Sequence, residues 1–143
     1  MNIFQPSQKM KLTHIEHIGI AVRNLEESIT FYEKVLGLSC YRIEEVKDQK
    51  VKTAFFKVGQ TKIELLESTD PNGPIAKFID KKGEGMHHLA FAVENIDETL
   101  KETAEKGVRL IDTSPRKGAE GLEIAFLHPH STFGVLTEFC EKK

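Results

Sequence analysis

Two histidines and two glutamates recur at equivalent places in the chain and could together bind a metal ion. His17 begins a short apolar run, and His88 begins a similar run 71 residues later. Glu64 and Glu138 lie in a second pair of similar segments, 74 residues apart. Two imidazoles and two carboxylates suit a borderline divalent ion and leave coordination positions for water or an oxygen-bearing substrate. The pattern predicts one metal shared between two halves of the chain.

The duplication extends well beyond the histidines. Residues 17–28 have the sequence HIGIAVRNLEES and residues 88–99 have HLAFAVENIDET, so His, Ala, Val, Asn and Glu recur in register. In each copy a strand-like apolar run is followed by an asparagine and an acidic turn, which is typical of a capped helix. We therefore expect each copy to begin with a strand and then a helix, the helices covering about 24–36 and 95–106.

Three further strands are predicted after each helix, which makes each half a βαβββ unit. In the first half these strands cover about 39–46, 51–58 and 61–67. In the second half they cover about 109–112, 122–127 and 134–139. A short helix over 75–79 is expected between the halves. The predicted fold is α+β, with one domain over 12–141 built from two modules, about 12–67 and 84–141.

Strand alternation places each histidine beside small side chains. His17 shares a strand face with Gly19, and His88 shares the equivalent face with Ala90, while the apolar residues between them point toward the helices. One such histidine alone would be explained most simply as a half-buried residue with a hydrogen-bond partner. Two equivalent copies, each with a strand glutamate, favour metal ligands instead.

The composition excludes several classes of protein. The chain has 143 residues, of which 39% are hydrophobic and 29% are charged, which indicates one globular domain. The net charge of −2 is spread along the sequence, so neither a nucleic-acid partner nor an anionic membrane is expected. Cys40 and Cys140 are too few for a disulfide scaffold. Neither residues 1–11 nor any later segment approaches the roughly 20 apolar residues of a membrane span, so a soluble, cytoplasmic protein is expected.

These segments resemble the vicinal oxygen chelate superfamily, which is also called glyoxalase/bleomycin resistance-like, and within it most closely the methylmalonyl-CoA epimerases. The similarity runs from about His14 to Glu141, and its most specific segments are HIEHIGIAV, KIELLE, PIAKFI, GMHHLA, FLHP and GVLTE. The resemblance implies paired βαβββ modules that form an incomplete barrel around a divalent metal. It also implies a ligand set of His17, Glu64, His88 and Glu138.

The activity that the resemblance implies is a metal-dependent isomerase acting on an acyl-CoA. Such an enzyme epimerises methylmalonyl-CoA by removing the α-proton and returning a proton on the other face through an enolate. Glu138 is the preferred base, and Glu64 is the second carboxylate beside the metal. Thr53 stands where one branch of the family carries a further glutamate. Co²⁺ is the favoured metal, Ni²⁺, Zn²⁺ and Mn²⁺ are compatible with the ligands, and a homodimer is expected.

Two other functions remain open. A lactoylglutathione lyase could use the same four metal ligands, although the segments around 74–79 and 128–129 favour the epimerase. A protein that sequesters a small molecule could use the same cavity without turnover. The presence of all four ligands makes this binding role the less favoured alternative.

Other chemically active residues receive lesser roles. Arg109, Arg116 and Lys117 lie near a glycine-containing loop, where they could meet the phosphates of CoA or simply face solvent. Cys140 is expected to be a packed thiol and not a nucleophile. The resemblance makes His87 a neighbour of the ligand, and it leaves outside the ligand set the histidines His14, His128 and His130.

Overall fold

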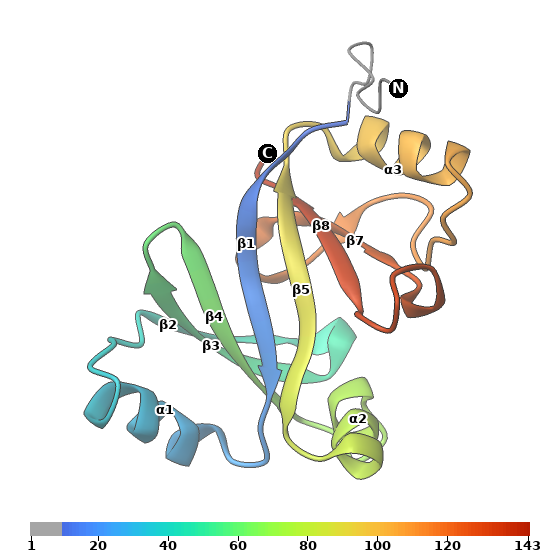
Figure 1. Ribbon diagram of the computed structural model, residues 1–143. Coiled ribbons are helices and arrows are strands. Elements are labelled where there is room, and N and C mark those ends of the chain that lie inside the picture. Colours follow the sequence, from blue (N-terminus) through green and yellow to red (C-terminus); the bar gives the residue numbers. More distant parts are fainter. Residues whose placement is uncertain (1–9) are drawn as a thin grey trace.

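The computed structural model describes residues 10–143, and two long strands run through its centre (Figure 1). These strands, β1 (Leu12–Ala21) and β5 (Gly85–Val93), pair antiparallel. On its other edge β1 pairs in parallel with β4 (Thr61–Ser68), and β5 pairs in parallel with β8 (Thr137–Glu141). The first nine residues lie outside the described range.

The strands of residues 10–143 form a single eight-stranded sheet in the order β2-β3-β4-β1-β5-β8-β7-β6. Its outer members are β2 (Arg42–Val46), β3 (Val51–Val58), β6 (Arg116–Lys117) and β7 (Glu123–Leu127). Counted outward from the central pair, each half of the sheet has the same order of strands, so the sheet repeats the internal duplication of the sequence. This curled, mixed sheet with its helices confirms the predicted α+β, glyoxalase-like fold.

The two predicted helices that follow β1 and β5 are present. They are α1 (Leu25–Lys34) and α3 (Ile96–Glu105), and each begins after an asparagine cap. The side chains of Asn24 and Asn95 accept hydrogen bonds from the backbone N–H groups of Glu27 and Glu98, at 3.0 Å in both cases. Between the halves lies α2 (Pro74–Lys82), which is longer than the predicted helix over 75–79.

One predicted strand is wrong. Residues 109–112 form no strand, and in this segment only Leu110 makes an isolated bridge, to Leu127. The segment still lies against β7, because the carboxylate of Asp112 accepts hydrogen bonds from the backbone N–H of Phe126 and from the side chain of Arg116. The regular partner of β7 on this edge is the two-residue strand β6, which pairs with Glu123 and Ile124. The strands predicted over 39–46 and 134–139 begin about three residues later, at Arg42 and Thr137.

Helices α1 and α3 pack on the outer face of the sheet, each over an apolar core of its own half, whereas Ile75 of α2 packs with Val51 and Leu66 beside the opposite face. In the first half, Leu25 of α1 packs with Phe56 and Leu65, and in the second half Ile96 of α3 packs with Phe139. The opposite, histidine-bearing face is equally buried, because the sheet curls around it and leaves Ala90 with no exposed surface. Among residues 10–143, no helix combines the length and hydrophobicity needed to cross a membrane.

Candidate metal centre

The strand register brings the four predicted ligands to one place. His17 on β1 lies opposite Ala90 on β5, and Ala90 lies beside Glu138 on β8. Each histidine is therefore separated by one small residue from a glutamate of the other half. The equivalent path across β5, β1 and β4 runs through His88, Gly19 and Glu64.

Three donor atoms converge on one point. The Nε2 atoms of His17 and His88 lie 3.0 Å apart. Oε1 of Glu138 lies 3.0 Å from Nε2 of His17 and 3.2 Å from Nε2 of His88. Two ligands that bind a common ion at about 2.1 Å and at right angles are themselves about 3 Å apart. These three side chains therefore fit the coordination sphere of one ion.

Glu64 belongs to the same cluster. Its Oε2 lies 3.2 Å from Nδ1 of His17, and ligand atoms of Glu64, His17 and His88 lie within 4.8 Å of one another. The exposed fractions of His17, Glu64, His88 and Glu138 are 4%, 5%, 8% and 3%. Because buried carboxylates require positive charge nearby, this donor set suits a divalent cation.

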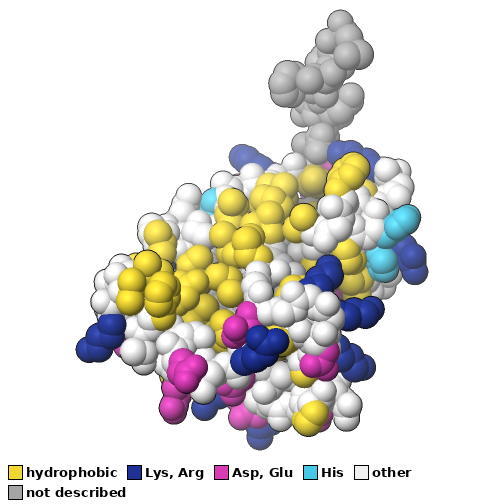
Figure 2. Space-filling view, turned by 60° about the horizontal axis from the view of Figure 1, so that its bottom comes forward, with side chains coloured by type: hydrophobic (Ala, Val, Ile, Leu, Met, Phe, Trp, Pro, Cys, Tyr) yellow, Lys and Arg dark blue, Asp and Glu magenta, His cyan; other side chains and the backbone are white. Residues whose placement is uncertain are grey.

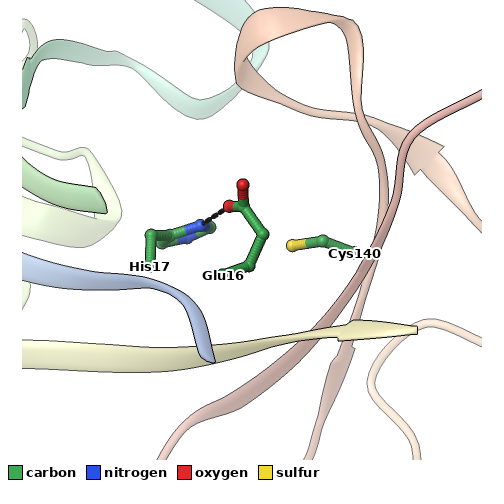
Figure 3. A group of neighbouring side chains, drawn as sticks. All are labelled: Glu16, His17 and Cys140. Carbon is green, nitrogen blue, oxygen red and sulfur yellow. Dashed lines mark hydrogen bonds and ion pairs between the residues drawn. The ribbon is translucent and has the colours of Figure 1, made fainter. Parts of the chain in front are cut away.

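A bulge in β1 brings a fifth residue to the site, which the sequence pattern missed. The pairing of β1 with β5 skips Glu16, the extra residue of the bulge, so Glu16 reaches the same side as its neighbour. Oε1 of Glu16 lies 2.5 Å from Nδ1 of His17. Figure 3 shows Glu16 between His17 and Cys140. Simple alternation would have placed Glu16 on the opposite face.

An equivalent bulge in β5 holds His87. The pairing passes from Gly19–His88 to Ile20–Met86, and it skips His87. The Nδ1 atoms of His87 and His88 lie 2.9 Å apart. Burial lowers the pKa of His87 to about 4, and a positive charge on His88 lowers it further. The His87 imidazole is therefore neutral near pH 7.

The carboxylates around His17 have widely separated pKa values. Burial raises the pKa of Glu64 to about 7, an effect that His17 partly offsets. Burial also acts on Glu138, but hydrogen bonds from His17 and His88 outweigh it and lower its pKa to about 2. Burial disfavours a charged His17, yet Glu64, Glu138 and Glu16 raise its pKa well above the usual value. The site is thus built to hold positive charge between these side chains.

The four donors line a cavity of about 310 Å³. The volume is at the lower end of the range for small-molecule sites, and the donors provide a compact polar region in it. Thr53 also lines the cavity and is only 1% exposed. Among the residues that line it, carboxylates are provided by Asp48, Glu64 and Glu138. The remaining wall is mainly apolar, with Val51, Leu66, Ile75, Leu122, Ile124 and Phe126.

The other candidate residues are distributed differently. Arg116 lines the cavity, where its guanidinium lies 5.6 Å from the ring centre of Phe126. Arg109 and Lys117 are not among the lining residues. Cys140 is buried, and burial raises the pKa of its thiol, so it has no thiolate character. Outside the donor cluster lie His14, His128 and His130, which contact Thr13 or one another.

Comparison with known proteins gives this geometry a context. Residues 16–126 match the Glyoxalase/Bleomycin resistance protein/Dioxygenase superfamily. The uncharacterized protein YqjC of Bacillus subtilis is 45% identical over 132 residues, which cover 92% of this chain and 94% of that protein. The mitochondrial methylmalonyl-CoA epimerase of Mus musculus is 35% identical over 137 residues, which cover 94% of this chain and 77% of the relative.

A solved structure also resembles the chain. It is a methylmalonyl-CoA epimerase in complex with methylmalonyl-CoA and NH4+, with a TM-score of 0.89 and 36% identity over 92% of this chain and 96% of that one. The repeated motif, the curled sheet and these relatives all point to the same superfamily. The chain belongs to the glyoxalase/bleomycin resistance protein/dioxygenase superfamily.

Proposed function

We propose that the protein is a methylmalonyl-CoA epimerase, a metal-dependent isomerase that interconverts the two epimers of methylmalonyl-CoA. The observation that carries this proposal is the convergence of His17, His88 and Glu138 within 3.0–3.2 Å beside a cavity. This arrangement occurs in a chain that is similar over 94% of its length to a named epimerase.

Epimerisation needs groups that remove and return a proton on opposite faces of one carbon atom. That carbon lies between the thioester and the carboxylate of the substrate, and its deprotonation gives an enolate. His17, Glu64, His88 and Glu138 would hold a divalent ion, which when bound would act as a Lewis acid toward the developing negative charge. Glu64 comes from β4 and Glu138 from β8, which flank the central strand pair on opposite sides. They are therefore suited to serve the two faces of the substrate.

The two carboxylates differ in their readiness to exchange a proton. In the metal-free site burial raises the pKa of Glu64 to about 7, and a bound divalent ion would lower it. The pKa of Glu138 is lowered to about 2 because its hydrogen bonds from both histidines outweigh burial. Thr53 provides no carboxylate on the neighbouring strand. We propose Glu64 and Glu138 as the proton-transferring pair.

Deuterium exchange into methylmalonyl-CoA tests the proposed function. Protein loaded with Co²⁺ should incorporate deuterium at the α-carbon in D₂O, as measured by mass spectrometry. Chelator-treated protein and a His88→Ala variant should lose this exchange, whereas His130→Ala, outside the donor cluster, should retain it. Reloading with Ni²⁺, Zn²⁺ or Mn²⁺ would rank the metals.

The same preparation can distinguish the alternatives. Metal-loaded protein that exchanges no α-proton of methylmalonyl-CoA would contradict the epimerase. Turnover of a glutathione hemithioacetal by that protein would identify a lactoylglutathione lyase. Saturable binding of either compound without turnover would instead support a binding protein.

The protein is proposed to form a homodimer. Within residues 10–143, several large hydrophobic side chains are exposed, and Phe133 is 100% exposed. Figure 2 shows hydrophobic side chains gathered over a broad area of one face. Burial of such an area in a partner copy would remove apolar surface from water. Light scattering should give twice the 16.2 kDa mass of the chain, and the mass of one chain would contradict the dimer.

A further inference from the structure

A line of charged side chains connects the donor cluster to a loop at the edge of the cavity. Nζ of Lys62 on β4 lies 2.7 Å from Oε2 of Glu16 and 2.8 Å from Oε1 of Glu120. Glu16 contacts His17 directly. Glu120 belongs to the short turn η2 (Ala119–Gly121), whose first residue lines the cavity. Lys62 therefore joins Glu16, beside the donor cluster, to Glu120 in the loop.

These contacts are largely shielded from water. The side chains of Lys62, Glu16 and Glu120 are 14%, 11% and 19% exposed. Ion pairs at this depth are screened less than surface pairs, and removing one member leaves a poorly solvated charge. The three side chains therefore form a buried structural connection, unlike solvated ion pairs on the surface.

Glu16 determines which ring nitrogen of His17 faces His88 and Glu138. Glu16 is paired with the Lys62 ammonium, and a carboxylate in that pair can only accept hydrogen bonds. Nδ1 of His17 then donates its proton to Glu16, which at 2.5 Å is nearer than the other carboxylate at this atom, Glu64 at 3.2 Å, and Nε2 is left directed toward His88 and Glu138. A carboxylate on the far nitrogen of a metal-binding histidine fixes the ring and raises its basicity.

At the other end, Glu120 fastens a loop of the second half to the first half. Its carboxylate accepts hydrogen bonds from Lys62 and from the hydroxyl of Tyr41, at 3.2 Å. Its backbone N–H donates to Oε1 of Glu44, at 3.1 Å. Glu120 also has a φ of 59°, in the left-handed region that disfavours a residue with a side chain. Contacts with three residues of the first half hold this strained position.

We propose that Lys62 is a positioning residue that couples the orientation of His17 to the seating of the loop over residues 115–121. The proposal rests on the proposed function, because it treats His17 as a ligand of the catalytic metal. Lys62 reaches neither the donor cluster nor the cavity lining itself. It acts through Glu16 on the metal site and through Glu120 on the loop. A loop that loses this anchor would loosen His17, and a disturbed metal site would loosen the loop.

The test measures metal affinity and loop mobility without substrate. Metal affinity is measured by competition with a chromophoric chelator, and loop mobility by amide hydrogen exchange of residues 116–121. Lys62→Met should weaken metal binding roughly tenfold, as expected when an outer-shell partner is lost, and should speed exchange in the loop. Lys57→Met, which removes the exposed lysine opposite Lys62 on β3, should match the wild type in both measurements.

Glu120→Gln provides a second test that does not depend on the folding of the Lys62 variant. Glu120 does not contact His17, so a several-fold loss of metal affinity in Glu120→Gln would demonstrate the coupling. Unchanged metal affinity in this variant, or a Lys62→Met protein that alters only one of the two measurements, would overturn it. Neither measurement uses methylmalonyl-CoA. Metal-loaded protein without α-proton exchange would therefore refute the epimerase and leave this test intact.

Discussion

Gly19 on β1 lies directly opposite His88 on β5, and the imidazole of His88 occupies the space that a side chain at Gly19 would fill. A Cβ atom built at Gly19 would lie 2.5 Å from Nδ1 and 2.8 Å from Nε2 of His88. Both distances are shorter than a van der Waals contact permits. The φ of Gly19 is outside the left-handed region, so the backbone conformation does not require glycine here. The nearby His88 ring does.

Gly19→Ala should therefore displace the His88 ring. We expect at least a tenfold loss of metal affinity and a destabilisation of about 1–3 kcal/mol from overpacking. Metal titration and thermal unfolding of the metal-free protein measure the two effects. Ala90→Gly, at the equivalent position opposite His17, introduces no clash and serves as the control. A Gly19→Ala protein with wild-type metal affinity would show that the ring does not need this space.

The internal repeat was sufficient to predict two similar βαβββ-type halves and to select the donor residues, whereas the incomplete barrel was implied by the family resemblance. The equivalence of His17 and His88, and of Glu64 and Glu138, follows from two similar pairs of segments. Because the two halves of the sheet have the same strand order outward from the central pair, equivalent positions near that pair come close together. The structure places these donors together as predicted, and their role as metal ligands stays a prediction. The proposed division into two modules within one domain also stays a prediction.

The parts that the sequence did not reveal depend on contacts between distant strands. Glu16 reaches His17 only because of a bulge, and the bulge is defined by pairing with β5, about 70 residues away along the chain. Simple alternation gives no sign of it. The Lys62–Glu120 ion pair joins residues of different halves and has no counterpart in the repeat. The strand predicted over 109–112 is wrong because local propensity cannot show that this segment makes only one isolated bridge to β7.

Arg116 is predicted to contribute to substrate binding. It lines the cavity beside Phe126, and Asp112 holds its guanidinium at 3.1 Å. An anionic thioester that enters the cavity would meet this positive charge. Arg116→Ala should raise KM for methylmalonyl-CoA about tenfold with little change in kcat, since uniform binding is lost. Lys117→Ala, which removes an adjacent charge outside the cavity, is the control. An unchanged KM in Arg116→Ala would indicate a solvated basic loop.

Cys140 is predicted to be inert toward alkylation in the folded protein. Its side chain lies beside Glu16 (Figure 3). It is buried, and burial raises the pKa of the thiol. Because the thiolate is the reactive form, iodoacetamide at pH 8 should modify the partly exposed Cys40 first. Cys140 should react only after unfolding in denaturant. Peptide mass spectrometry locates the label, and rapid native labelling of Cys140 would contradict the packed-thiol assignment.

His87 should make the metal-free protein less stable in mild acid. Burial, with a further contribution from a charged His88, lowers its pKa to about 4 in the folded state, against about 6.5 in the unfolded chain. The unfolded state therefore binds the proton more readily. The stabilisation is complete above about pH 6.5 and is lost as the pH falls toward about 4, by at most about 3 kcal/mol.

The comparison of wild type with His87→Gln isolates this contribution, because His17, Glu64 and Glu138 titrate in both proteins. Denaturant unfolding in the presence of a chelator, measured at intervals from pH 7.5 to pH 4, gives the free energy of unfolding of each. The wild type should lose stability relative to His87→Gln between about pH 6.5 and pH 4, and the difference should be constant above that interval. His130→Gln should show the wild-type profile, since His130 lies outside the donor cluster. Parallel curves for wild type and His87→Gln would show that His87 is protonated as easily in the folded protein as in the unfolded chain.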